Sequence, residues 1–168
     1  MATNPILGLD VYITLAAVGW ADGELTRAAA DAILRAAAEE GLDIESLQKL
    51  EEAVQKPVDV GVVDRMKMSK SDRLYVYAVA SWIATIDGEA SVRTREALDQ
   101  LGTALGVPKA PRDRADEIMR EIAEQDARPE RFDLRALRKT LDERLEAARA
   151  ARIAGNVKGD DEEESSGD

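Results

Sequence analysis

The sequence predicts an all-α protein: a bundle of about seven helices that contains two pseudo-repeated helical hairpins. Three observations lead to this prediction. Apolar residues recur at the three- and four-residue spacing of a helix in about seven segments. Glycine, proline, serine and aspartate lie between these segments, where they favour helix ends. One stretch of the chain also repeats without a gap at an offset of 65 residues.

The N-terminal third of the chain predicts three helices. The first, at about 8–21, is apolar on nearly every face, so we expect it at the centre of the bundle. Gly23 follows its end, and Thr26 caps a second, alanine-rich helix that runs to about residue 40. A third helix, at about 43–54, places four apolar side chains on one stripe that we expect to be buried: Ile44, Leu47, Leu50 and Val54.

The middle of the chain predicts a connector and two further helices. The connector, 56–64, holds the only strand-like pattern, an alternation of Val58, Val60 and Val62 that is too short and isolated for a sheet. Ser69 or Ser71 caps a long apolar helix that runs to about residue 86. After Gly88, Ser91 caps a helix whose expected buried side chains are Ala97, Leu98, Leu101 and Leu105.

Two helices complete the predicted domain. Pro111 suits the first position of the sixth helix, and the last helix runs over about 133–154. Residues 155–168 hold six acidic residues and one lysine, which is typical of a disordered segment. The sequence therefore predicts a helical domain over 1–154 and an acidic disordered tail over 155–168.

The last helix also carries several basic residues among acidic neighbours. Arg138 and Asp142, like Lys139 and Glu143, have the i,i+4 spacing of ion pairs on a solvated face. A second hypothesis is that the acidic residues 160–164 fold back onto the arginines of this helix and screen their charge.

Composition excludes several kinds of catalytic and metal site. The chain has 168 residues, a formal net charge of −11, and neither histidine nor cysteine. It therefore offers no disulfide, zinc–thiolate site, catalytic thiol or Ser-His-Asp triad. A metal site would have to use oxygen ligands, which favours calcium, magnesium or manganese. The acidic balance opposes binding to nucleic acid or to an anionic membrane.

Residues 12–43 align with residues 77–108 when the sequence is shifted by 65 positions. Each unit contains a buried helix, an Asp-Gly-Glu turn, a second helix and a terminating glycine. Neither hairpin buries its apolar face alone, so we expect the units to stack with their first helices in the centre. The aligned tyrosines of these helices are expected to place their hydroxyls near polar partners. The main matches are Tyr12 with Tyr77, Asp22-Gly23-Glu24 with Asp87-Gly88-Glu89, and Gly41 with Gly106.

The two Asp-Gly-Glu turns permit two interpretations. One is structural, because Asp and Gly are common at helix ends and Glu in a first turn suits the helix dipole. The other is that the two turns meet, and that their carboxylates hold a divalent cation or contact a basic partner. The candidate metal ligands are Asp22, Glu24, Asp31, Asp87, Glu89 and Glu96. The spacing excludes an EF-hand, because Gly23 at loop position 6 places Trp20 at a ligand position.

This duplicated pattern resembles the TerB-like (tellurite-resistance B) superfamily, which includes the N-terminal region of DjlA-type co-chaperones. The resemblance implies an all-α bundle with internal pseudo-symmetry, a bacterial stress-associated role, and an acidic, metal-linked surface rather than an active site. Family members often carry further acidic residues early in the second helix, where this chain has Ala28, Ala29, Arg93 and Thr94. The residues that carry the resemblance are Ala21-Asp22-Gly23-Glu24 with Gly41-Leu42, and Ile86-Asp87-Gly88-Glu89 with Leu105-Gly106-Val107.

We therefore expect a non-enzymatic, TerB-like, stress-associated interaction module, which depends on a divalent cation if the turns bind one. The alternative is a purely structural helical adaptor with no metal site. The expected partner is another protein, and no small-molecule substrate is evident. The two apolar stretches, Val11–Ala21 and Leu74–Ile86, are 11 and 13 residues long, short of the ~20 that a membrane span needs. The first residues lack a basic signal-peptide region, so we expect a cytoplasmic protein.

Overall fold

The computed structural model describes residues 7–57 and 65–165, and this part of the chain is helical with no strand. The predicted fold class, an all-α bundle of about seven helices, is confirmed. The elements in chain order are α1 (Leu9–Trp20), α2 (Arg27–Glu39), α3 (Ile44–Ala53), the 3-10 helix η1 (Arg65–Lys67), α4 (Lys70–Thr85), α5 (Val92–Leu105), α6 (Lys109–Gln125), the 3-10 helix η2 (Pro129–Arg131) and α7 (Leu134–Ser165).

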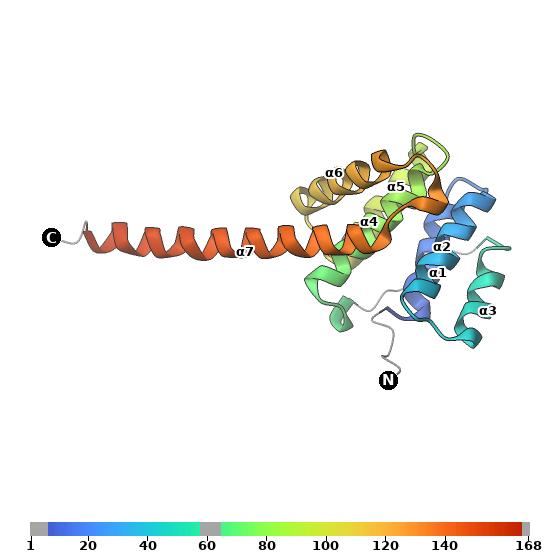
Figure 1. Cartoon of the computed structure of the whole chain (residues 1–168), viewed down its shortest axis with the longest axis horizontal. Helices are drawn as coiled ribbons and strands as arrows, with labels where there is room; N and C mark the ends of the chain where they lie inside the picture. Colours follow the sequence, from blue (N-terminus) through green and yellow to red (C-terminus); the bar gives the residue numbers. More distant parts are fainter. Residues whose placement is uncertain (1–6, 58–64, 166–168) are drawn as a thin grey trace.

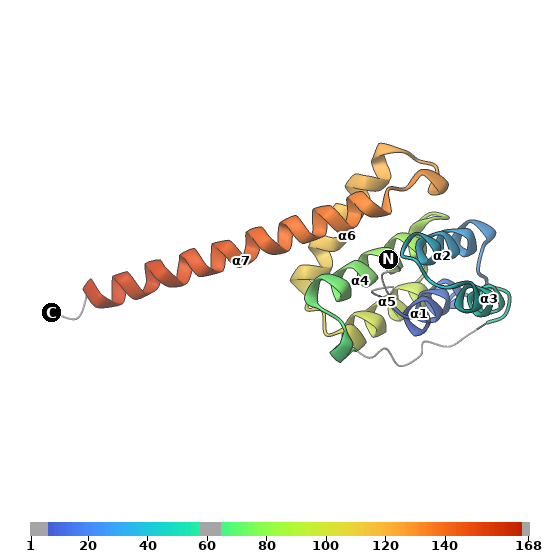
Figure 2. The same cartoon turned by 60° about the horizontal axis from the view of Figure 1, so that its bottom comes forward.

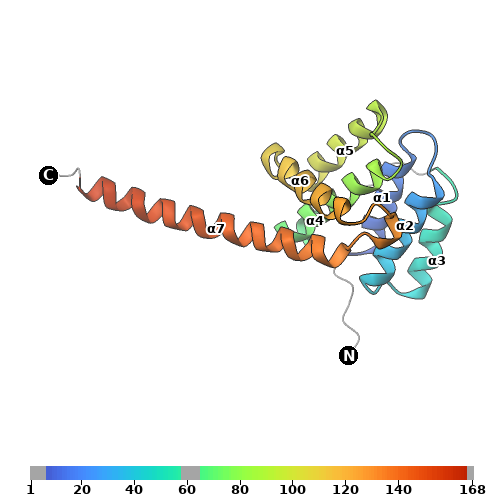
Figure 3. The ribbon, with the colours of Figure 1, turned by 45° about the horizontal axis from the view of Figure 1, so that its top comes forward.

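The two most apolar helices, α1 and α4, pack against each other at the centre of the bundle. On one side α1 contacts α2 and α3, and on the other α4 contacts α5, α6 and α7. Figures 1 and 3 show these two groups of helices on either side of the α1–α4 pair. Both central helices are buried along most of their length, as a helix that is apolar on every face requires.

The two hairpins turn with equivalent backbone hydrogen bonds. The Gly23 amide donates to the Trp20 carbonyl over 2.8 Å, and the Gly88 amide donates to the Thr85 carbonyl over 3.1 Å. Both glycines have positive φ angles, 89° and 124°, a region that residues with a Cβ atom avoid. The turns at offset 65 therefore have the same local structure.

The second helices of the hairpins also match at both ends. At their starts, one hydroxyl in each unit caps the helix over the same distance of 3.2 Å, from Thr26 in α2 and from Ser91 in α5. At their ends, the Leu42 amide donates to Ala37 over 3.0 Å and the Val107 amide donates to Gly102 over 2.9 Å. The repeat is thus present in the backbone as well as in the sequence.

Substituting alanine for Gly23 or for Gly88 is expected to lower the free energy of unfolding by about 1–2 kcal/mol, because a Cβ atom disfavours positive φ. Gly155→Ala is the matched control, since Gly155 lies in α7 with open space where a Cβ would point and no positive φ. That substitution should leave stability equal or slightly higher. Urea unfolding of the three variants measures the difference, and equal stability in all three would contradict the turn geometry.

Two helices differ from their predicted form. Helix α6 begins at Lys109 after an N-cap at Pro108, so Pro111 lies in the first turn and not at its first position. That turn tolerates proline because its amides have no partner within the helix. In α3 the predicted buried stripe is wrong at Ile44, which is 76% exposed, because this first residue of an edge helix extends beyond α1 and α2. The valines of the predicted connector, residues 58–64, lie outside the described residues.

Helix α7 shows the largest difference from the prediction. It was expected to end near residue 154 but continues to Ser165, so the described part of the predicted disordered tail is helical. No proline interrupts it, and each residue added to an existing helix forms a further hydrogen bond without a new nucleation step. Figures 1 and 2 show its C-terminal part extending away from the other helices. The predicted domain boundary at residue 154 therefore falls inside one helix.

In the structure the acidic residues 160–164 continue the same helix as the arginines and are not folded back onto them. Independently, none of the helices in the described ranges combines the length and the apolar character that crossing a membrane requires.

The start of α7 is fixed to the rest of the bundle by Arg35 of α2. The Arg35 guanidinium donates to the carbonyl of Glu130 over 2.6 Å and to the carbonyl of Phe132 over 2.8 Å. The Phe132 ring stacks on Trp82 of α4, with 4.1 Å between ring centroids. These contacts place the first turns of α7 beside the C-terminal end of α2.

Candidate functional site

The two Asp-Gly-Glu turns lie next to each other, as the second of the two interpretations of these turns requires. The Thr26 hydroxyl donates to the Asp87 carboxylate over 2.6 Å, which joins the first turn to the second. Because Thr26 is the N-cap of α2, this carboxylate lies at the positive end of that helix dipole. Asp87 therefore has a structural role in holding the two turns together.

The predicted metal ligands do not gather into one cluster. All six side chains are exposed, and in the described part of the chain no group of three or more acidic residues lies close enough to hold a metal ion. The turns meet through a hydroxyl and one carboxylate, while the other carboxylates are directed to solvent. The residues Asp22, Glu24, Asp31, Asp87, Glu89 and Glu96 therefore do not fit a shared divalent cation.

Calcium, magnesium or manganese at about 1 mM is expected to change the Tm by less than about 1 °C, because an ion stabilises only a fold that binds it. Differential scanning fluorimetry measures this. A rise of several degrees that is lost in the variant with Asp22→Asn and Asp87→Asn would contradict the expectation and restore the cation hypothesis.

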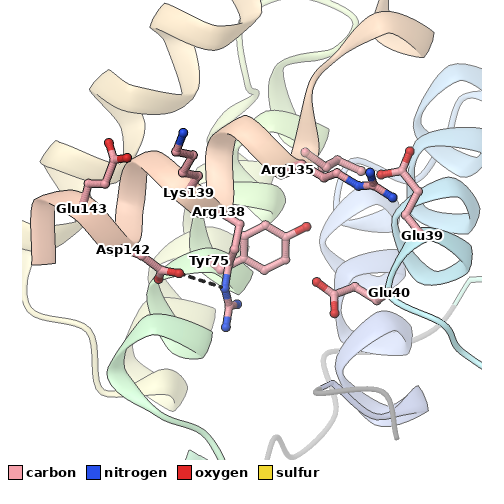
Figure 4. Close-up of a pocket in the computed structure, with 9 residues that line it drawn as sticks. Glu39, Glu40, Tyr75, Arg135, Arg138, Lys139, Asp142 and Glu143 are labelled. Atoms are coloured by element: carbon pink, nitrogen blue, oxygen red, sulfur yellow. Dashed lines mark ion pairs between the residues drawn. The ribbon is translucent and has the colours of Figure 1, made fainter. Parts of the chain in front are cut away.

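A groove of about 530 Å³ lies between the C-terminal end of α2, the helix α4 and the first turns of α7 (Figure 4). Its walls carry three cationic and four carboxylate side chains, with one aromatic and one aliphatic residue between them. The lining residues are Glu39, Glu40, Tyr75, Leu134, Arg135, Arg138, Lys139, Asp142 and Glu143.

Arg138 is the central side chain of this groove. Its guanidinium pairs with the buried Asp72 of α4 through a short hydrogen bond, and its Nε lies 3.8 Å from Asp142. It also lies over the Tyr75 ring, 4.9 Å from the centroid. Burial opposes ionisation of Asp72, but hydrogen bonds from Arg138 and Ser69 outweigh it and hold the pKa of that carboxyl below its usual range. Arg138 thereby ties α7 to α4.

Two polar groups of the groove lining, Glu40 and Nη1 of Arg138, have no partner among the described residues. The Tyr12 hydroxyl, which is not part of the lining, is also buried without a hydrogen bond, although it was expected to reach a polar partner. Glu40 is half-buried and makes neither an ion pair nor a side-chain hydrogen bond with the described residues. Burial raises the pKa of the Glu40 carboxyl, Arg138 opposes this rise, and the charge of Asp72 adds to it. The groove thus contains a carboxylate that the protein does not neutralise directly.

The repeat shows how unusual this carboxylate is. At offset 65, Glu40 corresponds to Leu105, which is 0% exposed at the end of α5. The tyrosines of the two units are both buried, but their charged neighbours differ. Burial and then Asp116 raise the pKa of Tyr77 to about 12, and Arg112 lies over its ring. The charged residue with the largest influence on the pKa of Tyr12 is instead Glu40. One unit fills the position with an aliphatic side chain, and the other leaves a groove with a carboxylate.

Sequence reasoning missed this groove. Arg138 was predicted to pair with Asp142 on a solvated face, but its side chain is only 22% exposed and its close partner is Asp72, 66 residues away. The repeat alignment held one usable signal, since it places a glutamate opposite a core leucine.

No protein-family model, no curated protein and no solved structure matches this chain. The resemblance to TerB-like proteins therefore rests on the duplicated turns alone. The groove and its charges are the features of the structure that bear on function.

Proposed function

We propose that the protein is a non-enzymatic interaction module, TerB-like and stress-associated, that acts in the cytoplasm and binds another protein through the groove between α2, α4 and α7. The observation that supports this most directly is Glu40, a half-buried carboxylate of the groove lining that has neither an ion pair nor a side-chain hydrogen bond among the described residues. A polar group left without a partner costs about 1–3 kcal/mol, so a partner protein that satisfies it gains affinity.

The chemistry of the groove favours recognition over catalysis. Burial raises the pKa values of Tyr12 and Tyr75 above their usual range, which makes both hydroxyls poor bases and poor nucleophiles. The guanidinium of Arg138 is engaged by Asp72 and Asp142. The groups that remain accessible are fixed charges and hydrogen-bonding groups, which are typical of a binding site.

A second candidate is the purely structural adaptor, in which the acidic turns only shape the hairpins. Residues 151–155 of α7 all have exposed side chains, and this exposed helical surface favours the alternative. An adaptor of this kind would offer α7 to its partner, and the groove would have no part in binding.

Quantitative capture of partner proteins by variants of the full chain tests the proposal. Filling the groove with the bulky substitutions Arg135→Trp and Lys139→Trp is expected to remove a specific partner. The matched control, Arg93→Trp with Arg95→Trp on the exposed face of α5, should retain it. Equal capture by both variants contradicts the groove as the binding site, and loss of capture only after truncation at residue 154 supports the adaptor.

The stress-associated part of the proposal has its own test. Cells that express only the groove variant should be as sensitive to tellurite as cells that lack the protein, while the α5 control should restore tolerance. Unchanged tolerance in cells lacking the protein would contradict this part and leave the binding proposal intact.

A further inference from the structure

The groove contains one half-buried carboxylate that has no ion pair among the described residues. Arg138 has two carboxylates against its guanidinium, Asp72 and Asp142. Glu40 lies on the opposite wall, and Figure 4 shows its carboxylate directed across the groove toward Arg138 and Tyr75. The other carboxylates of the lining, Glu39, Asp142 and Glu143, are exposed, so Glu40 is the one that solvent compensates least.

We infer that this groove binds a primary ammonium group, the lysine side chain of a partner protein, and that Glu40 pairs with its charge. This inference rests on the proposed function, since it names the chemistry of the partner at the same groove. An anionic ligand is disfavoured because the lining carries four carboxylates against three cationic side chains, and the buried Asp72 beside Arg138 adds a fifth negative charge.

An ammonium group suits the oxygen atoms around Glu40. Tyr75 lines the same groove and makes no side-chain hydrogen bond with the described residues. After burial, Glu40 is the largest influence on the pKa of Tyr75, so that hydroxyl lies in its field. The phenol oxygen and the carboxylate offer acceptors to the N–H donors of an ammonium group.

The apolar part of the groove matches the rest of a lysine side chain. Leu134 and the Tyr75 ring line the same space as Glu40. A lysine stem buries its methylene groups on such surfaces while its ammonium group reaches a polar site.

The second hairpin supports a functional origin for this carboxylate. Leu105 shows that the equivalent position accepts a fully buried aliphatic side chain. A carboxylate at such a position is costly unless a cation neutralises it, and within the chain Glu40 has no such partner. Binding of a lysine would supply the missing cation.

Nuclear magnetic resonance titration of the ¹⁵N-labelled full chain tests this inference with four capped tripeptides. The probes are acetyl-Gly-Lys-Gly-amide and the matched peptides with Arg, Gln or Glu in the middle. The lysine peptide should shift the resonances of Glu40 and Tyr75 saturably at millimolar concentration, and the Gln and Glu peptides should not. Tighter binding of the arginine peptide, or no binding of the lysine peptide, overturns the choice of ammonium.

Two substitutions connect the binding to its proposed ligands. Glu40→Gln keeps the shape of the side chain but removes its charge, and should weaken lysine binding about tenfold. Tyr75→Phe removes only a hydroxyl that lines the groove and should weaken binding about threefold without lowering the Tm. The control Glu96→Gln, an exposed carboxylate on α5, should leave the affinity within about twofold. Wild-type affinity in Glu40→Gln overturns the inference.

Glu40→Leu copies the residue of the other hairpin and separates binding from folding. We expect it to abolish lysine binding while the Tm stays equal or rises by about 2–4 °C, because an unpaired carboxylate is replaced by an apolar side chain. A marked fall in the Tm would show that Glu40 is structural and would overturn the inference.

The outcomes also separate this inference from the proposed function. If the Glu or Gln peptide binds the groove and the lysine peptide does not, the groove remains an interaction site and only the ammonium is wrong. If the lysine peptide binds but the tryptophan substitutions at Arg135 and Lys139 leave partner capture unchanged, the ammonium site stands and the proposed partner surface is wrong.

Discussion

Arg138→Met is expected to lower the free energy of unfolding by about 3 kcal/mol, the effect of leaving one charge of a largely buried pair without its partner. Asp72 would keep its burial and lose the guanidinium that now favours its ionised form. The variant also loses the contact with the Tyr75 ring, and with it the connection between α7 and α4. Urea unfolding at pH 7 measures the change.

The control for this prediction is Arg149→Met, on the exposed part of α7, which should change stability by less than about 0.5 kcal/mol. The pH dependence gives a second check. The folded pKa of Asp72 is depressed, so its contribution to stability is present above its unfolded pKa and is lost as the pH falls through the folded value. The difference between wild type and Arg138→Met should therefore shrink in acid. A pH-independent difference would show that the ion pair is not its cause.

The helices and the repeat could be predicted because their signals are local. Thr26 and Ser91 cap helices through hydrogen bonds to amides three residues away, and the glycines at the turns adopt backbone angles that other residues avoid. Ser69, and not Ser71, caps α4 because Asp72 three residues later completes a capping box. Both partners of each of these interactions lie within a few residues of each other, so the local sequence is enough to predict them.

The candidate site could not be predicted in the same way, because its contacts join distant segments. The i,i+4 rule correctly placed Arg138 near Asp142, but Asp72 became its close partner only through the packing of α7 on α4. For the acidic turns, the sequence left open whether the segments meet, and it did not give the directions of their side chains. Those directions decide whether carboxylates share a cation, and they depend on which face of each turn is covered.

Leu105→Glu is expected to lower the free energy of unfolding by about 4 kcal/mol, or to prevent folding, because it removes a buried aliphatic side chain and buries a carboxylate. At offset 65 this is the reverse of Glu40→Leu, so the same two residue types are exchanged at equivalent positions of the two hairpins. Leu105 is fully buried, whereas Glu40 borders a groove, so the two exchanges should have opposite effects on stability.

Thermal unfolding of both variants, with Leu105→Ala as the control for lost apolar contacts, measures this asymmetry. Leu105→Ala should cost about 3 kcal/mol, so any larger loss in Leu105→Glu reports the buried charge. If Leu105→Glu and Glu40→Leu both changed stability only slightly, the position would tolerate either residue in both hairpins. The glutamate would then be an ordinary difference between the repeats. A large loss at Leu105 together with a neutral or favourable change at Glu40 would instead mean that the first hairpin keeps a carboxylate where folding alone prefers an apolar residue.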